Sequence, residues 1–344
     1  MQLTSLEIDG FRGLRDFKAQ IPRLVTLVAG KNNAGKSTLL EAIEMLAGAS
    51  NPRSFLTVNG QRELTCHSLD DMTSFFYGRD VRNRIHLAGA FREGIVRHVA
   101  LSSQMPQSGE LSVDVANSGM PREFIYSYFD GTEGRDPQPG LVRFAEGGAD
   151  QLKWEVLKET EVKNWKCAVC TSGNEPKTCD IVSQLKNACS EAWLVEFLKK
   201  MDANIQDITV DKSNILLGID NLNNRLPLQL MGDGINKVVK VLGLMCSVGE
   251  GGIVCVDEVD NGLHYSAMRS FVDQVVRLAV ERKVQVLMTT HSLELMRFFS
   301  SGVSEREEDF GFLRMVRYGD GQTVAFPYDA RSFAASLKGG VELR

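Results

Sequence analysis

The segment from Gly30 to Ser37 constrains the possible folds of this chain more than any other feature. It reads Gly-Lys-Asn-Asn-Ala-Gly-Lys-Ser and matches the pattern G-x-x-x-x-G-K-[S/T] without a gap. The apolar run 24–29 before it has the character of a buried strand, and 37–46 after it carries apolar residues at helical spacing. A glycine loop between a strand and a helix turns backbone N–H groups toward phosphate. The sequence therefore predicts an α/β fold that binds a nucleoside triphosphate.

Each position of this loop has an expected role. Lys36 is expected to reach the β- and γ-phosphate oxygens, and the Ser37 hydroxyl is expected to bind Mg²⁺. The predicted nucleotide-binding residues of the loop are Gly30, Asn32, Asn33, Ala34, Gly35, Lys36, Ser37 and Thr38. A chance glycine loop is the alternative, and the preceding strand and following helix argue against it.

Two acids follow a second apolar run, residues 253–256. Ligands of parallel sheets bind at the carboxyl ends of the strands, which is where Asp257 is expected. Asp257 would hold Mg²⁺ through its water shell, and Glu258 would act as a general base on the attacking water. A pair of solvated acids at a strand end is the alternative interpretation. His291 follows the apolar run 284–290, and its spacing behind the acids favours a γ-phosphate sensor over a purely structural histidine.

The remaining chain alternates apolar strands and helices, which predicts an α/β core with a parallel sheet. Short alternating segments over 81–116 predict an antiparallel meander. Residues 117–180 are rich in Gly, Pro, Asp and Glu and are expected to be irregular, with helical periodicity returning over 181–201.

Composition limits the cellular setting and the partners. The formal net charge of −5 gives no overall attraction to nucleic acid, so DNA binding is neither shown nor excluded by the sequence. No apolar run approaches the roughly 20 residues that cross a bilayer, so no membrane association is expected. The seven cysteines include Cys246 and Cys255 in apolar segments, which favours a reducing, cytoplasmic compartment.

Four cysteines in the middle of the chain raise the question of zinc. Cys167 and Cys170 have the C-x₂-C spacing of zinc ligands, and Cys179 and Cys189 could complete a tetrahedral site. Cys189 falls on the apolar stripe of the expected helix, however, and the other spacings match no strong template. Zinc is therefore the less favoured interpretation of this group.

Taken together, five segments resemble the ATPase heads of the RecF/SMC/OLD branch of the ABC superfamily. They are most similar to the compact OLD-like AAA ATPases of bacterial anti-phage systems. The similarity covers about residues 1–50 and 205–300, with a possible terminal match at 342–344. The matching segments are Phe11-Arg12-Gly13-Leu14, the glycine loop, Met231-Gly232-Asp233-Gly234, the run from Asp257 to His264, and Thr289-Thr290-His291-Ser292.

The resemblance implies that ATP with Mg²⁺ is clamped between two copies of the chain, as a homodimer or a higher homo-oligomer. Gly232, Asp233 and Gly234 stand where transporters carry the signature motif, and they would bind the γ-phosphate held by the facing subunit. Arg12 matches a basic residue that touches nucleotide. The position of His264 favours the OLD-like group over a transporter subunit, and Gln104 and Gln107 are weak candidates for the Q-loop glutamine.

The resemblance also implies one ATPase head over residues 1–344. A first lobe would comprise 1–116 and about 250–344, and a helical or irregular arm with the signature lobe would comprise about 117–249. Only about 50 residues follow His291, which leaves no room for a nuclease domain, and no coiled-coil insertion is recognisable. We therefore expect an ATP-driven switch that gates or scaffolds a separate effector, a nuclease or toxin, in anti-phage defence.

Other functions remain open on the sequence alone. One is a DNA repair or maintenance ATPase of the RecF/SMC type, and another is a nucleotide-dependent module that sequesters a toxin or senses a phage protein. A transporter ATPase subunit is less favoured. A self-contained nuclease would need acids from the middle region, namely Asp130, Glu133, Asp136, Glu146 and Asp150, whose spacing matches no metal-nuclease motif.

Overall fold

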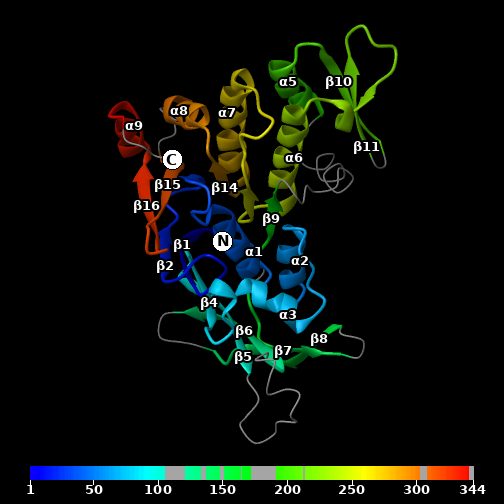
Figure 1. Cartoon of the computed structure of the whole chain (residues 1–344). Coiled ribbons are helices and arrows are strands. Elements are labelled where there is room, and N and C mark those ends of the chain that lie inside the picture. Colours follow the sequence, from blue (N-terminus) through cyan, green and yellow to red (C-terminus); the bar gives the residue numbers. More distant parts are fainter. Residues whose placement is uncertain are drawn as a thin grey trace, which may run out of the picture. The chain divides into compact units, whose positions relative to one another are not determined.

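The computed structural model of the chain describes residues 1–104, 121–132, 137–147, 151–163, 165–171, 191–211, 214–302 and 308–340 (Figure 1). The chain forms two compact units. Unit 1 comprises Met1–Ile21, Lys31–Trp165 and Met315–Phe326, and unit 2 comprises Pro22–Gly30, Lys166–Arg314 and Pro327–Arg344. None of the helices in the described ranges is long and apolar enough to cross a membrane.

Unit 1 is built on a seven-stranded antiparallel sheet. In spatial order its strands are β2 (Phe17–Gln20), β1 (Leu3–Asp9), β4 (Ile85–Phe91), β5 (Ile95–Gln104), β6 (Glu123–Thr132), β7 (Gly140–Glu146) and β8 (Leu152–Lys158). The helix that follows the glycine loop, α1 (Lys36–Ala47), contacts β4 and β5. The sheet is thus the platform on which the helix of the phosphate loop rests.

Short helices and aromatic rings complete the core of unit 1. The helices are α2 (Ser54–Gly60), α3 (Leu69–Met72) and the 3₁₀ turns η1 (Thr73–Phe75) and η2 (Tyr77–Arg79). The ring of Phe55 meets the rings of Phe75, Tyr126 and Phe144 edge-on, with centroids 5.0 to 5.7 Å apart. These contacts join α2 to β6 and β7 in the arrangement that aromatic rings prefer.

The expectation of an irregular stretch over 117–180 is wrong for much of its described part, because β6, β7 and β8 extend the antiparallel sheet. In β6, Phe124, Tyr126 and Tyr128 alternate with more exposed residues, the period that puts one face of a strand in a core. The expected boundary at residue 117 also differs from the structure, which groups these strands with unit 1.

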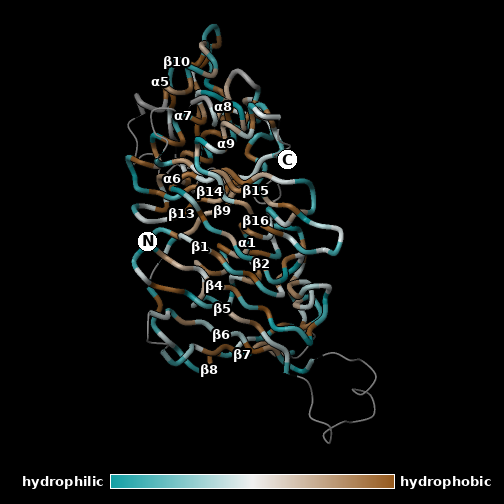
Figure 2. The backbone as a smooth tube through the Cα atoms, turned by 90° about the vertical axis from the view of Figure 1, so that its left-hand side faces the viewer, coloured by the Kyte–Doolittle hydropathy of each residue, from teal (hydrophilic) through white to brown (hydrophobic). Residues whose placement is uncertain are grey.

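Unit 2 contains the parallel strands that the sequence predicted. A six-stranded sheet runs in the order β16 (Thr323–Asp329), β15 (Phe310–Arg317), β3 (Val25–Gly30), β14 (Gln285–Thr290), β13 (Ile253–Val256) and β9 (Cys167–Cys170). Strand β13 pairs in parallel with β14 and β9, and β14 pairs in parallel with β3. Strands β15 and β16 each continue from one unit into the other. The tube in Figure 2 is hydrophobic along β13 and β14, as expected of strands covered on both faces.

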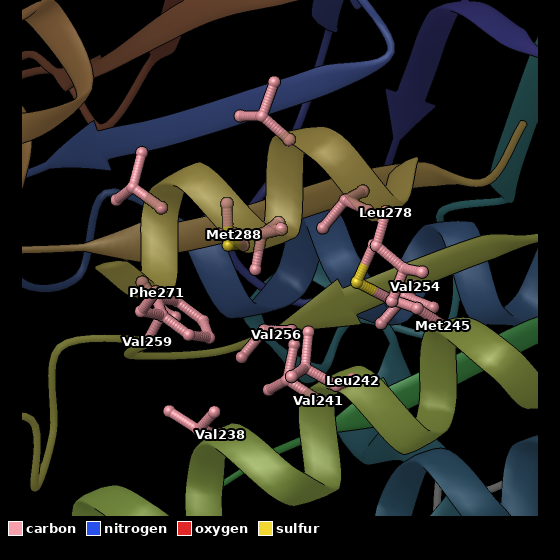
Figure 3. Packing of buried hydrophobic residues seen from close by; sticks show 14 of the residues in the cluster. Val238, Val241, Leu242, Met245, Val254, Val256, Val259, Phe271, Leu278 and Met288 are labelled. Atoms are coloured by element: carbon pink, nitrogen blue, oxygen red, sulfur yellow. The ribbon is translucent and has the colours of Figure 1, made fainter. Parts of the chain in front are cut away.

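Helices supply the rest of the unit 2 core. They are α5 (Glu191–Met201), α6 (Asp233–Val248), α7 (Tyr265–Arg282), α8 (Leu293–Gly302) and α9 (Ala330–Lys338). Figure 3 shows Val238, Leu242 and Met245 of α6 directed toward Val254 and Val256 of β13. Strands β10 (Ile205–Asp211) and β11 (Asn214–Ile219) pair antiparallel, and β12 (Leu226–Pro227) and η3 (Leu228–Leu230) lead into α6.

Candidate nucleotide site

The glycine loop adopts left-handed backbone angles at two positions, Asn33 with φ of 63° and Gly35 with φ of 90°. A Cβ atom at Gly35 would lie 2.6 Å from Cδ2 of Leu14, which is fully buried. Leu14 belongs to the Phe11-Arg12-Gly13-Leu14 turn, so this turn packs against the loop. Glycine is required at position 35 both by the backbone angle and by this close approach.

Lys36 lies inside the loop rather than in solvent. Its side chain is buried, and Nζ donates a hydrogen bond to the carbonyl oxygen of Lys31 at 3.1 Å. A buried ammonium group held across the loop is placed to meet phosphate oxygens, which are strong acceptors. Ser37 and Thr38 follow in the first turn of α1.

The N-terminus of α1 presents its backbone donors beside this lysine. Within the described chain, no side chain caps the helix, whose N-cap is Gly35, and its first turn contains no acidic residue. A helix N-terminus without a side-chain cap carries the partial positive charge of the helix dipole, which favours an anion there. The geometry of unit 1 thus fits the predicted phosphate-binding function.

Arg317, at the end of β15, contacts this loop and was not predicted from the sequence. Its Nη1 donates a hydrogen bond to the carbonyl oxygen of Asn33 at 3.1 Å, which braces one of the left-handed positions. Nothing in the local sequence singles it out, because Arg317 lies 284 residues away in the chain.

Arg12 is engaged within unit 1. Its Nε lies 2.8 Å from a carboxylate oxygen of Glu41 on α1, and Nη2 donates to Oδ1 of Asn59 at 3.1 Å. The guanidinium also lies 5.2 Å from the centre of the Phe75 ring. Burial lowers the pKa of Arg12 to about 10 even though Glu41 opposes the change, so the group stays charged at neutral pH. A contact between Arg12 and nucleotide remains a prediction.

In unit 2, Asp257 stands directly after β13, as predicted. Its backbone N–H donates to the Cys170 carbonyl at 2.8 Å, which extends the pairing with β9 by one residue. Its Oδ1 accepts a 2.5 Å hydrogen bond from the hydroxyl of Thr289 on β14. The Asp257 carboxylate is therefore fixed at the carboxyl edge of the parallel strands.

Glu258 adopts a left-handed conformation, with φ of 47°. Its backbone N–H donates to the Thr289 hydroxyl at 2.8 Å, and its Oε2 accepts from Nδ2 of Asn261 at 2.6 Å. Non-glycine residues held at positive φ are uncommon and recur at functional sites. The acid proposed as general base is thus held in a specific conformation by its surroundings.

The end of β14 contributes a second clamp. The Thr290 hydroxyl donates to Oδ1 of Asp260 at 2.6 Å and accepts from the backbone N–H of Ser292 at 3.0 Å. His291, which lies between Thr290 and Ser292 in the chain, is half-buried. In the sequence, Thr289 and Thr290 stand out only as part of the Thr289-Thr290-His291-Ser292 motif. Two hydroxyls at the end of an otherwise apolar strand were the signal that could have revealed their structural role.

The predicted signature segment opens α6. Gly232 is the N-cap, and Gly232 and Asp233 are exposed. Residues 257–264, which follow β13 and contain both predicted acids, are called the acid loop below. Gly234 lies against this loop, because a Cβ at Gly234 would meet the Gly262 carbonyl oxygen at 2.7 Å. The two glycines therefore differ: Gly234 permits a close approach inside unit 2, while a Cβ at Gly232 would meet open space.

The cysteine pair does not have the geometry of a zinc ligand pair. Cys167 and Cys170 lie three residues apart on β9, and successive side chains of a strand point to opposite faces, so the two thiols face opposite ways. Burial raises the pKa of the Cys170 thiol, which disfavours the thiolate that zinc needs. Among the described residues, no three His, Cys, Asp or Glu are grouped to hold a metal. Cys179 and Cys189 lie outside the described residues.

The described residues include some of the acids considered for a nuclease site and one of the two candidate Q-loop glutamines. Asp130 forms a bidentate ion pair with the buried Arg97, at 2.7 and 2.9 Å, which makes it a structural acid rather than a nuclease residue. Glu146 ends β7, and Gln104 ends β5. Gln107, Glu133, Asp136, Asp150 and the terminal segment 342–344 lie outside the described residues.

Comparison with known proteins gives two family matches. The family described as "AAA domain, putative AbiEii toxin, Type IV TA system" matches residues 179–297, and the "AAA ATPase domain" family matches residues 1–95. The range 1–95 contains the glycine loop and Arg12. The range 179–297 contains the signature segment, Asp257, Glu258 and His291.

A curated protein of Helicobacter pylori, named "ATP/GTP phosphatase", is 25% identical over 343 residues, covering 90% of each chain. Among solved structures, an SMC head bound to the C-winged helix domain of ScpA aligns with a TM-score of 0.51 and 12% identity, covering 96% of this chain and 99% of that one. An SMC head with an extended coiled coil, bound to the C-terminal domain of ScpA derived from Pyrococcus furiosus, gives a TM-score of 0.51 and 9% identity, covering 98% and 99%.

The class follows from these findings together. The chain has an α/β fold like that of SMC heads, and two of its segments match AAA ATPase family models. The family matches and the curated relative support an ATPase that hydrolyses nucleotide.

Proposed function

We propose that this protein is an ATP-driven switch whose ATP-bound homodimer gates or scaffolds a separate effector protein in anti-phage defence. The observation that carries the proposal is the arrangement in unit 2. Glu258 is held in a left-handed conformation beside Asp257 by the Thr289 hydroxyl, and the same acid loop packs on the start of α6. A carboxylate poised in this way suits the activation of water for ATP hydrolysis.

The residues predicted to bind ATP and Mg²⁺ and to hydrolyse ATP have the following roles in this proposal. Lys36 and the backbone N–H groups of the loop bind the phosphates of ATP. Mg²⁺ would be bound by Ser37 directly and by Asp257 through water, and a hydroxyl and a carboxylate oxygen are the donors that this ion prefers. The bound ion would neutralise phosphate charge. Glu258 activates the attacking water, and His291 contacts the γ-phosphate.

The exposed start of α6 supports the dimeric part of the proposal. Gly232 and Asp233 are accessible at a helix N-terminus, where backbone donors favour an anion. We infer that they bind the γ-phosphate of ATP held by a second copy of the chain. Two ATP molecules would then hold the dimer together, and hydrolysis would release it.

Two comparisons bear on the partner. The family matched by residues 179–297 is described by a toxin and a type IV toxin–antitoxin system, which favours defence with a toxin or nuclease as effector. The aligned SMC heads are complexes with ScpA, which favours a partner protein and keeps a DNA maintenance role as the second candidate. A module that sequesters a toxin without turnover is the remaining alternative.

The central experiment compares Glu258→Gln with Lys36→Ala. Glu258→Gln is expected to bind ATP, to lose at least about 100-fold in turnover, and to accumulate as a dimer on gel filtration with ATP. Lys36→Ala is expected to lose ATP binding and to stay monomeric. Unchanged hydrolysis by Glu258→Gln would remove this residue from the mechanism, and a monomer in saturating ATP would exclude the ATP-bound dimer.

The defence role has its own test. Phage plating is compared on cells that carry this gene with its neighbouring genes, as wild type, Glu258→Gln or Lys36→Ala. Protection that is lost in both variants is expected, because the effector would no longer be switched. Equal protection by all three would contradict ATP-dependent gating.

A further inference from the structure

Lys237 links the helix that begins at the signature segment to the loop that carries the acids. It lies in the second turn of α6, and its Nζ donates a short hydrogen bond to the backbone carbonyl oxygen of Glu258. Both residues belong to unit 2. This contact joins a residue four positions after Asp233 directly to the backbone of the proposed general base.

The surroundings of Lys237 are polar on one side and apolar on the other. The side chain is half-buried, and Asp257, Glu258 and Asp260 attract its charge. Burial lowers the pKa of Lys237, while the Cys170 thiol and these three carboxylates oppose the change. Its helical neighbours Val238 and Val239 are fully buried, so the helix has little freedom to turn the ammonium group away.

The backbone of Glu258 is held from two sides. Its N–H donates to the Thr289 hydroxyl of β14, while its carbonyl accepts from Lys237 of α6. The next N–H, of Val259, donates to the Thr289 carbonyl at 2.9 Å. The positive φ of Glu258 is unfavourable by itself, so its conformation depends on these contacts persisting.

We propose that Lys237 is a positioning residue that couples the placement of α6 to the orientation of Glu258. The inference rests on the proposed function, in which the start of α6 contacts the γ-phosphate held by the second subunit. When ATP draws this helix end into place, the Lys237 ammonium group holds the Glu258 carbonyl, and the carboxylate is set for the attacking water. The Glu258 carbonyl also accepts the backbone N–H of Asn261 at 3.0 Å, within the same loop. Without the Lys237 contact, the left-handed conformation loses the anchor that α6 provides.

Lys240 provides a matched control on the same helix. It lies three residues further along α6, is also half-buried, and its pKa is likewise lowered by burial. The charge that acts on it is that of Cys170, whereas Lys237 is also influenced by the three acids. Replacing Lys240 removes a half-buried cation from the same helix and leaves the contact between Lys237 and Glu258 in place.

The test uses the full-length protein and the variants Lys237→Met, Lys237→Arg, Lys240→Met and Glu258→Gln. Lys237→Met is expected to lower kcat by about 10- to 100-fold, since misplacing a catalytic group by about 1 Å has effects of this size. Its KM for ATP is expected to change by less than about twofold, because no phosphate contact is removed. Like Glu258→Gln, it is expected to accumulate as an ATP-bound dimer. Lys237→Arg keeps a charged donor and is expected to restore most turnover, and Lys240→Met is expected to hydrolyse ATP normally.

The outcomes separate this inference from the proposed function. Normal kcat in Lys237→Met, or an equal loss in Lys240→Met, would overturn the positioning role while Glu258→Gln remains inactive. Full turnover in Glu258→Gln would overturn the proposed function itself. If Lys237→Met folds poorly, the melting temperature shows it, and Lys237→Arg then decides: a folded Arg variant with turnover as low as Glu258→Gln would contradict the inference.

Discussion

The hydroxyl of Thr289 lies 2.5 Å from Oδ1 of Asp257, joining the ends of two neighbouring parallel strands. The hydroxyl oxygen of Thr289 also accepts a hydrogen bond from the backbone N–H of Glu258 at 2.8 Å. Thr289 is fully buried, so water cannot readily replace its hydroxyl. One side chain thus fixes both acids of the candidate site, and its removal should affect both stability and turnover.

Replacing Thr289 with valine keeps the shape of the side chain but removes the hydroxyl. The Glu258 N–H and the Asp257 carboxylate would then each lose a partner, which should lower the free energy of unfolding by about 1–3 kcal/mol and reduce turnover. Thr289→Ser keeps the hydroxyl and should retain most of both. Denaturant unfolding and ATPase assays provide the measurement, and equal losses in the two variants would contradict a specific role of the hydroxyl.

Gly35→Ala should abolish ATP binding. The added Cβ would meet Leu14 at 2.6 Å, at a φ of 90° that alanine rarely adopts, so the loop would be displaced. Gly60→Ala is the control, because a Cβ there would meet nothing within 4 Å and should leave ATP binding unchanged. Isothermal titration with an ATP analogue distinguishes the two. Tight binding by Gly35→Ala would show that the loop can adapt.

The two signature glycines should respond differently to alanine. Gly234→Ala would place a Cβ 2.7 Å from the Gly262 carbonyl oxygen, and it is expected to lower the melting temperature because α6 must shift from the acid loop. Gly232→Ala is expected to melt like the wild type, since it has open space and an extended backbone. ATP-dependent dimerisation should fall in Gly232→Ala if this position approaches the phosphate of a second subunit. Normal dimerisation would indicate that Gly232 only starts the helix.

Glu44 should make stability depend on pH. Burial raises its pKa to about 7, and the neighbouring Glu41 adds to the effect while the hydrogen bond from Gln61 opposes it. Between about pH 4.5 and 7 the folded state binds more protons than the unfolded state, so the free energy of unfolding falls as the pH rises. Glu44→Gln should remove this slope and raise stability near pH 8. Melting temperatures of both proteins from about pH 5 to 8 test it, and parallel curves would contradict the role of Glu44.

Much of unit 2 could be predicted because its signals are local. The apolar runs before Asp257 and His291 predicted buried parallel strands, and β13 and β14 confirm them. The alternation in β6 was overlooked because the surrounding glycines, prolines and acids dominated the interpretation of residues 117–180. In the described part of this stretch, β6, β7 and β8 pair with partners supplied by the rest of the sheet.

The bracing residues could not be predicted, because their roles depend on contacts between distant segments. Arg317 reaches Asn33, Thr289 reaches Asp257 and Lys237 reaches Glu258, and each pair is at least 21 residues apart. A threonine after an apolar strand, or a lysine in an apolar helix, is compatible with many surroundings. Only the packing of α6 and β14 around the acid loop selects these partners.

The sequence by itself determined the glycine loop, the position of the two acids after a buried strand, and the glycine-containing signature segment. These features depend on residue type and short-range spacing, which the chain carries wherever it folds. Tertiary structure alone decided that Thr289 and Lys237 hold Glu258 in a left-handed conformation and that Arg12 pairs with Glu41. The physical reason is that a hydrogen bond or ion pair acts only over a few ångströms, so the folded chain must first bring its two groups together.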